Sequence, residues 1–367
     1  MPPSKTALPV YPLSQLYFYL TAGCNLRCRH CWLAPKYQSS ESSKGSLDFS
    51  LFREILEQAR PLGLTSVKFT GGEPLLHPRF DELLELIQAA DLGLLMETNG
   101  VLVTPALARN LARGKTPAIS VSLDGVDAAT HEWVRGVPGS FQRALEGMRH
   151  LVRAGLHPQI IFTVMRANKE QMPAVVRLAE ELGAGSIKFN ILQPTARGEQ
   201  MHEAGEALGL EELIALGRWV ETELSRTTTL PVFFDHPLAF RPLSRMLGQD
   251  GDGCAICGIL GILGVLADGS YALCGIGTTE PGLLFGHSGH DRLADVWQKH
   301  PVLQELRTGL PGKLTGICRA CLLKPVCLGS CLAQNYYRTK DLWSPYWYCQ
   351  EADRLGFFPA SRKLPVS

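Results

Sequence analysis

Three cysteines that directly follow an apolar segment near the N-terminus constrain this chain more than any other feature. Cys24, Cys28 and Cys31 stand in the stretch LTAGCNLRCRHCW. Their spacing suits three corners of a four-iron cube, and three thiolates leave the fourth iron open to bind and reduce a ligand. A zinc knuckle, a redox dithiol and three unrelated buried thiols are the alternatives. The spacing therefore favours a reactive iron-sulfur site over a purely structural one.

The cysteines begin where a buried strand is expected to end. Leu16 to Leu20 form an apolar run that stops at Thr21, and Gly23 and Asn25 then supply turn residues. Barrel enzymes carry their reacting groups at the carboxyl ends of the strands. We therefore expect the cysteine segment to lie at the mouth of a barrel.

Further strands are expected at regular intervals, each followed by a segment of helical period. This alternation predicts an α/β fold with a parallel sheet and right-handed crossovers. The expected strands span residues 67–70, 92–98, 118–123, 159–165 and 186–192. Polar residues at their ends are candidates for ligand contacts: Glu97, Thr98, Asn99, Ser122, Asp124, Asn190 and Gln193.

A second motif, Gly71-Gly72-Glu73-Pro74, follows the strand that ends at Thr70. Glycines let a backbone approach a ligand closely, and a carboxylate accepts hydrogen bonds from an amino group. Alone, the motif could be an ordinary strand-to-helix turn. Some forty residues after the cysteines it strengthens the prediction of a ligand site.

Together these motifs resemble the radical S-adenosylmethionine (SAM) enzymes, whose signature is C-x3-C-x2-C after the first strand of a partial barrel. The resemblance covers almost the whole chain and implies a partial (β/α)6 TIM barrel. A 4Fe-4S cluster would be held by Cys24, Cys28 and Cys31, with SAM chelating the open iron. Reductive cleavage of SAM would give a 5'-deoxyadenosyl radical that abstracts a substrate hydrogen.

The same resemblance implies a set of SAM contacts. Glu73 would receive the SAM amino group, and Ser122 and Asp124 would occupy the position that contacts the ribose. For Asp124 and Asp127, helix capping is an equal alternative, because aspartate is favoured at helix starts. The residues expected to contact SAM are Gly71, Gly72, Glu73, Asn99, Ser122, Asp124 and Arg135.

The other eight cysteines all lie beyond residue 250. Pairs such as Cys254/Cys257 and Cys318/Cys321 could form a zinc ribbon. The pattern C-x2-C-x5-C-x3-C resembles instead the SPASM domain, a small cysteine-rich module that follows the barrel in part of this family. By that resemblance there are two further 4Fe-4S clusters, auxiliary I on Cys254, Cys257, Cys274 and Cys331, and auxiliary II on Cys318, Cys321, Cys327 and Cys349.

These motifs divide the chain into five expected segments. They are a lead-in (1–14), a radical SAM barrel (15–226), a bridge (227–250), a SPASM domain (251–358) and a tail (359–367). The apolar run Ile259 to Leu266 would form a strand pair around the Asp268-Gly269 turn. One helix carrying Leu293, Val296, Trp297, Leu303 and Leu306 would pack on the cluster module.

Bulk properties exclude several other classes of protein. The 367 residues are 45% hydrophobic, enough for a barrel of about two hundred residues plus a smaller module. A net charge of +1 gives no electrostatic footprint for nucleic acid. The N-terminus lacks an apolar signal, and no segment is long enough to span a membrane, so we expect a cytoplasmic protein whose thiols stay reduced.

The SPASM resemblance implies a ribosomally made precursor peptide as substrate. Only about fifteen residues precede the first strand, so a separate small leader-binding protein is an expected partner, together with an electron donor such as flavodoxin or ferredoxin. Several stretches resemble maturases of cyanobacterial nif11-type peptides, some of which are spliceases that excise a tyramine unit. Candidate peptide contacts are Tyr17, Tyr19, Trp32, Lys36, Arg197, Trp343, Tyr346, Trp347 and Tyr348. For each aromatic, packing around a cluster or the barrel mouth is the favoured alternative.

Other outcomes stay open at this point. Related enzymes form thioether or carbon-carbon crosslinks. Anaerobic sulfatase-maturating enzymes place an aspartate, as a base, directly after a cysteine of the first auxiliary cluster, where this chain has Gly275 after Cys274. A non-catalytic iron-sulfur or zinc scaffold is the alternative from a different class. No catalytic base is identified.

Overall fold

A ten-stranded sheet forms the frame of the molecule in the computed structural model, which describes residues 11–38, 45–243, 246 and 257–364. The sheet order is β12-β11-β10-β1-β4-β5-β6-β7-β8-β9, and a separate short ladder joins β2 to β3. The strands are β1 (Gln15–Tyr19), β2 (Gly23–Cys24), β3 (Lys36–Tyr37), β4 (Ser66–Thr70), β5 (Gly93–Thr98), β6 (Lys115–Ser122), β7 (Gln159–Val164), β8 (Ser186–Ile191), β9 (Val232–Phe234), β10 (Ile262–Val265), β11 (Ser270–Ala272) and β12 (Leu284–His287).

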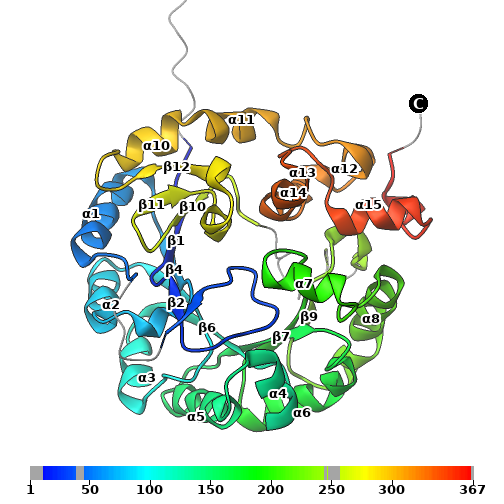
Figure 1. Cartoon of the computed structure of the whole chain (residues 1–367), viewed down its shortest axis with the longest axis horizontal. Coiled ribbons are helices and arrows are strands. Elements are labelled where there is room, and N and C mark those ends of the chain that lie inside the picture. The colour runs from blue at the N-terminus through cyan, green and yellow to red at the C-terminus, as the bar shows by residue number, and fades with distance from the viewer. Residues whose placement is uncertain (1–10, 39–44, 244–245, 247–256, 365–367) are drawn as a thin grey trace, which may run out of the picture.

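Six parallel strands, β1 and β4 to β8, form the partial barrel, as the sequence predicted. Figure 1 shows these strands as an inner arc with helices outside it. The helices are α1 (Phe49–Ala59), α2 (Phe80–Ala89), α3 (Pro105–Leu111), α4 (Ala128–Arg135), α5 (Ser140–Arg153), α6 (Met172–Leu182), α7 (Arg197–Glu203), α8 (Leu210–Thr222), α10 (Leu293–Lys299), α11 (Pro301–Gly309), α12 (Gly316–Ala320), α13 (Lys324–Cys327), α14 (Leu332–Thr339) and α15 (Trp347–Arg354).

The helices cover the sheet because each buries one apolar stripe. On α5 the buried residues Ala144, Leu145, Met148 and Leu151 recur at intervals of three and four residues. Asp48 caps the N-terminus of helix α1, and its carboxylate accepts hydrogen bonds from the backbone N–H groups of Ser50 (2.8 Å) and Leu51 (3.2 Å). An acceptor at this position satisfies N–H groups that the helix itself cannot.

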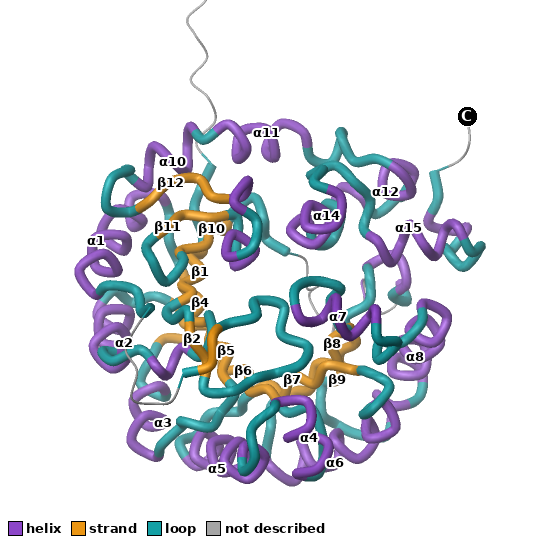
Figure 2. Tube along the Cα trace, viewed as in Figure 1, coloured by secondary structure: helices purple, strands orange, loops and turns teal. Residues whose placement is uncertain are grey.

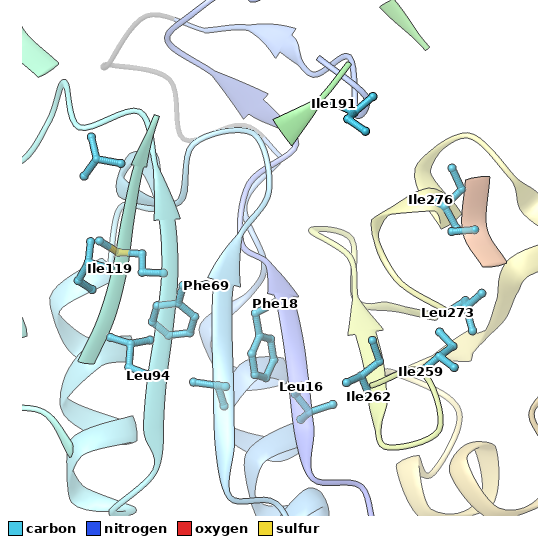
Figure 3. Packing of buried hydrophobic residues seen from close by; sticks show 14 of the residues in the cluster. Leu16, Phe18, Phe69, Leu94, Ile119, Ile191, Ile259, Ile262, Leu273 and Ile276 are labelled. Atoms are coloured by element: carbon cyan, nitrogen blue, oxygen red, sulfur yellow. The ribbon is translucent and has the colours of Figure 1, made fainter. Parts of the chain in front are cut away.

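Aromatic and aliphatic side chains fill the space between strands and helices. The ring centroids of Phe18 and Phe52 lie 4.6 Å apart, and those of Phe18 and Phe69 lie 6.3 Å apart. Figure 3 shows this core continuing from Phe69 and Phe18 through Leu16 to Ile262 on β10. One hydrophobic core therefore joins the barrel to the C-terminal region.

The C-terminal cysteine-rich region starts as an extension of the barrel sheet. Strand β10 pairs in parallel with β1, with Gln15 opposite Ile262, and β11 and β12 follow as antiparallel strands. Within the stretch 227–250, expected as a bridge, β9 pairs in parallel with β8. Figure 2 shows one arc of strands from β12 to β9, with α12, α14 and α15 in the remaining sector. The five-segment division of the chain stays a prediction.

The helix expected across Leu293 to Leu306 is in fact two helices. Helix α10 ends at Lys299 and α11 begins at Pro301. The residue before a proline is disfavoured in helical conformation, and His300 is accordingly extended (φ −60°, ψ 129°). Helix α10 also packs on the barrel side, since Leu293 N donates to Gln58 Oε1 of α1 at 2.8 Å.

The described part of the expected tail is packed against the body. Leu322 N donates to Arg362 O at 2.8 Å, and Leu364 N donates to Ala320 O at 2.8 Å. These backbone hydrogen bonds hold residues 362 to 364 beside α12. Among the described residues, we find no helix with the length and apolar character that a membrane span requires.

Candidate active site

The three N-terminal cysteines face one cavity at the carboxyl ends of the barrel strands. This barrel cavity has a volume of about 340 Å³ and is lined by Cys24, Cys28 and Cys31 together with residues at the ends of β4, β5, β6 and β8. Strand β2, which contains Cys24, pairs with β3 and thereby closes the cysteine loop on itself. In Figure 1 this dark-blue loop crosses the centre of the ring.

Hydrogen-bond donors point at two of the cysteine sulfurs. Leu26 N lies 3.4 Å from Cys24 Sγ, and Arg135 Nη1 lies 3.6 Å from Cys28 Sγ. Burial raises the pKa of the Cys28 thiol, and the Arg135 guanidinium opposes that rise. Donors and a cation stabilise thiolates, which are the form that binds iron. The loop therefore has the chemistry that a 4Fe-4S cluster requires of its ligands.

The spacing of these ligands differs from that of a single-ion site. Among the described residues, no three His, Cys, Asp or Glu side chains are grouped as ligands of one metal ion. In an iron-sulfur cube each thiolate binds a different iron atom, so the sulfurs stand farther apart than around one ion.

Glycines bring the segment that follows β4 against the cysteine loop. Gly71 has φ +125°, a conformation that L side chains rarely adopt, and a Cβ on Gly72 would lie 1.8 Å from Gly23 O. Glu73 N donates to Gly23 O at 3.0 Å, which fixes the two segments side by side. Of the expected SAM contacts, Gly72 thus lies against Cys24, and Gly71 lies against the backbone of Tyr19 to Thr21.

Glu73 is buried and held by residues at the end of β5. Its Oε1 accepts from Thr98 Oγ1 at 2.7 Å, and its Oε2 accepts from Asn99 N at 2.9 Å. Burial raises the pKa of Glu73 to about 7. The Asn99 side chain continues the network to the cysteine loop, donating to Asn25 Oδ1 at 2.7 Å.

The remaining expected SAM contacts take two different positions. Ser122 and Arg135 line the barrel cavity, whereas Asp124 is fully buried behind it. The Asp124 carboxylate lies 2.6 Å from Arg135 Nη2 and accepts from Thr163 N at 2.7 Å. Asp124 therefore orients Arg135, and Asp127 caps α4 by accepting from Thr130 N at 2.8 Å.

Several residues of the cavity wall were not predicted from sequence. Glu97, Thr98, Asn190 and Gln193 line the cavity as expected from their places at strand ends, but so do Lys68, Lys188 and Asp235. A signal was present in the sequence, because Lys68 and Lys188 each interrupt an otherwise apolar strand, Val-Lys-Phe and Ile-Lys-Phe. A lysine in such a strand points into a barrel whose interior is polar.

The C-terminal cysteines gather in two places. Cys318, Cys321, Cys327 and Cys349 line one cavity. Cys257 and Cys331 line a second cavity of about 150 Å³. Cys274 lies near both of them: burial raises the pKa of its thiol most, and the neighbouring Cys331 and Cys257 thiols raise it further. Cys254 lies outside the described residues. These groups follow the two expected ligand sets, whose assignment to clusters stays a prediction.

The candidate peptide contacts are scattered. Trp32 lines the barrel cavity, and Tyr19 and Lys36 line a neighbouring hollow of about 820 Å³. Tyr346 lines the second cysteine cavity, whereas Trp343 and Trp347 pack on the core.

For Tyr348 the expected contact with a peptide is wrong. Its side chain is fully buried, and its ring centroid lies 5.1 Å from that of Phe240. The two remaining candidates lie close to parts of the site: Tyr17 has Lys68 Nζ 5.0 Å from its ring centroid, and Arg197 Nη2 donates to Pro35 O at 3.2 Å.

Comparisons with known proteins agree with this geometry. Residues 18–179 match the model of the radical SAM superfamily. An AdoMet-dependent heme synthase of Methanosarcina barkeri is 30% identical over 345 residues, covering 90% of this chain and 94% of the relative. The mycofactocin maturase MftC of Mycobacterium ulcerans is 28% identical over 355 residues, covering 95% and 91%. The structure of Streptococcus suis SuiB bound to its precursor peptide SuiA superposes with a TM-score of 0.71 at 19% identity, covering 93% of this chain and 76% of that one.

Proposed function

This chain belongs to the radical SAM superfamily, and we propose that it modifies a ribosomally made precursor peptide. It is a radical SAM enzyme related to peptide maturases and to heme synthases. One observation carries the proposal: Cys24, Cys28, Cys31 and Glu73 face a single cavity at the mouth of the barrel. SAM bound there would supply the 5'-deoxyadenosyl radical that removes a hydrogen atom from the substrate.

The chain's own residues would hold and orient SAM. The cysteine thiolates would ligate the cluster, and Arg135 would counter the charge of the Cys28 sulfur, 3.6 Å away. Glu73 would accept from the SAM amino group while Thr98 and Asn99 keep its carboxylate in place. Gly71 and Gly72 let the segment after β4 pack directly on the backbone that leads into the cysteine loop, which a side chain at either position would prevent.

The surroundings of the barrel cavity support an elongated substrate. The hollow of about 820 Å³ adjoins the barrel cavity and shares Leu33, Gly71 and Gly72 with it. An extended peptide could therefore lie in the hollow and place one residue in the cavity. The C-terminal cysteines would hold two auxiliary clusters, as the SPASM resemblance implies, giving three 4Fe-4S clusters in all.

For the reaction itself we propose splicing, in which a tyramine unit is excised from the peptide backbone. The resemblance of the cysteine and C-terminal stretches to nif11-type maturases supports this outcome. A small leader-binding protein and a flavodoxin or ferredoxin would act as partners. Crosslinking and sulfatase-maturase-like oxidation begin with the same hydrogen abstraction, and they differ in which atom is held against the radical.

The test is co-expression with the precursor peptide and any leader-binding protein encoded beside the gene, followed by mass and fragmentation analysis of the peptide. Splicing predicts internal loss of a tyramine-sized piece, whereas loss of hydrogens between two residues identifies a crosslinking enzyme. Cys28→Ala and Glu73→Gln should abolish or strongly reduce the change, while Glu85→Gln on the exposed face of α2 should leave it intact. An unmodified peptide with SAM still cleaved would refute the proposal.

The relative from M. barkeri favours a second candidate, a reaction on a tetrapyrrole. It is 30% identical and matches 90% of this chain. The two candidates are distinguished by incubating the reduced enzyme and SAM with either the peptide or a tetrapyrrole precursor of heme. Conversion of the tetrapyrrole with no change in the peptide would assign this second function.

A further inference from the structure

Four charged side chains on the wall of the barrel cavity belong neither to the cysteine loop nor to the expected SAM contacts. Lys68 on β4 pairs with Glu97 on β5, with 2.6 Å between Nζ and Oε1. Lys188 on β8 pairs with Asp235, which follows β9, with 3.2 Å between Nζ and Oδ1. All four line the barrel cavity together with the three cysteines.

Placing charged side chains inside a barrel costs free energy, because they lose part of their hydration. Charged groups inside a barrel need partners, and here each lysine has a carboxylate. The side chains keep a share of their surface open, 18% for Lys68, 41% for Glu97, 25% for Lys188 and 36% for Asp235. Since they line the cavity, their polar atoms can still reach a molecule that enters it. The two pairs together carry no net charge.

The two pairs act on the same space. Burial would raise the pKa of Glu97, but Lys68 and, less strongly, Lys188 bring it below its ordinary value. Glu97 is therefore stabilised in its charged form by Lys188 of the other pair as well as by Lys68 of its own. Asn190, two residues after Lys188 on β8, also lines this cavity, and its Oδ1 is buried without a hydrogen-bond partner among the described residues.

This wall suits an uncharged side chain that both donates and accepts hydrogen bonds. A phenol, a hydroxyl or a carboxamide can donate to Glu97 or Asp235 and accept from a lysine. Because the four charges sum to zero, the attraction of a carboxylate to the lysines is offset by its repulsion from the two acids, so its loss of hydration is not compensated. The same holds for an ammonium group. Sites of this kind discriminate by leaving the wrong ligand with unpaired or opposed polar groups.

The second pair also stands at a junction. Asp235 and Gln193 line both the barrel cavity and the cavity that contains Cys257 and Cys331. A substrate residue bound by Lys188 and Asp235 would thus lie between the SAM site and the cavity that contains Cys257 and Cys331.

We propose that the ion pairs Lys68–Glu97 and Lys188–Asp235 bind the reacting residue of the substrate and select an uncharged, hydrogen-bonding side chain over a carboxylate. This inference rests on the proposed peptide substrate and extends it to the chemistry of one residue. The pairs are specificity-determining elements of the barrel cavity.

The test uses two forms of the precursor peptide that differ in charge alone. The residue found to be modified is replaced by glutamine in one and by glutamate in the other, and each labelled peptide is titrated with the reconstituted enzyme by fluorescence anisotropy. The wild-type enzyme should bind the glutamine peptide roughly ten-fold more tightly. Asp235→Asn, which leaves Lys188 without its carboxylate, should move the ratio of the two Kd values about ten-fold toward the glutamate peptide.

A second variant and a control keep the test independent of folding. Glu97→Gln should shift the ratio in the same direction, and a ratio is insensitive to a general loss of active protein. Asp91→Asn removes the carboxylate of the exposed Lys115–Asp91 pair (2.6 Å) and should leave the ratio unchanged. An unchanged ratio in both cavity variants, with the natural peptide still modified by the wild type, would overturn the inference alone. A wild-type enzyme that neither binds nor modifies the natural peptide would overturn the proposed function as well.

Discussion

Asp124 and Arg135 form an ion pair, with 2.6 Å between Oδ2 and Nη2, in which both side chains are buried. Arg135 also reaches Cys28, with Nη1 3.6 Å from Sγ. The pair thus connects the end of β6 to the cysteine loop through α4. Its position makes Asp124 a residue that acts on the cluster site through Arg135.

Removal of Asp124 should destabilise the protein strongly. Asp124→Ala leaves the Arg135 charge buried without its partner, a change that costs on the order of 3–5 kcal/mol in other proteins. Chemical denaturation of the anaerobically prepared protein measures this loss. Glu82→Ala breaks the exposed Arg79–Glu82 pair and should change the free energy of unfolding little. Equal effects of the two substitutions would contradict a structural role for the buried pair.

The contact between Gly72 and Gly23 predicts a specific defect in the cysteine loop. Gly72→Ala would place a Cβ 1.8 Å from Gly23 O, next to Cys24, so the loop must move. We expect loss of about four irons per chain and loss of 5'-deoxyadenosine formation, because one cluster is displaced. Gly312→Ala is the matched control, since its Cβ would meet Gly309 O at an ordinary 3.5 Å. Normal iron content in Gly72→Ala would show that the loop tolerates the shift.

The strand order of the barrel was predictable because it follows from local patterns. The six expected strands are present, with ends within a few residues of those expected, since each is an apolar run bounded by turn residues. The helix break before Pro301 could also have been predicted, because it depends on the residue after His300.

Long-range pairing could not be predicted in the same way. Strand β10 pairs with β1 although Ile262 and Gln15 are far apart in the chain. The hydrophobic pattern of a strand does not indicate which edge of the sheet that strand will join. The approach of Cys331 to Cys274 likewise depends on the fold. In the sequence, these two cysteines could be assigned to one cluster only through the resemblance to the SPASM domain.

His77 predicts a dependence of stability on pH. Its Nε2 lies 2.8 Å from Leu47 O and its Nδ1 accepts from Arg79 N at 3.2 Å, so the ring is neutral and ties the segment after Glu73 to the start of α1. Burial lowers the pKa of His77 below its ordinary value of 6.5. At pH values between the lowered pKa of the folded protein and 6.5, His77 binds more protons in the unfolded chain than in the folded protein. The stabilisation by His77 should therefore be complete above pH 6.5 and fall as the pH falls below it.

Comparison with His77→Gln isolates this contribution. The difference in free energy of unfolding between wild type and variant should shrink as the pH falls from about 7 toward 5, measured by urea denaturation. A constant difference for His77→Gln across this range would exclude the neutral, buried state of His77.

The two groups of C-terminal cysteines predict two independent losses of iron. Cys349 shares a cavity with Cys318, Cys321 and Cys327, whereas Cys331 lies with Cys257. If each group holds one four-iron cluster, Cys349→Ala and Cys331→Ala should each remove about four irons per chain, and the double variant about eight. Iron and sulfide analysis of anaerobically reconstituted protein measures this. Because Cys327 lines both cavities, a single substitution that removes both clusters would instead indicate one cooperative site, and retained zinc with little iron would contradict the cluster assignment.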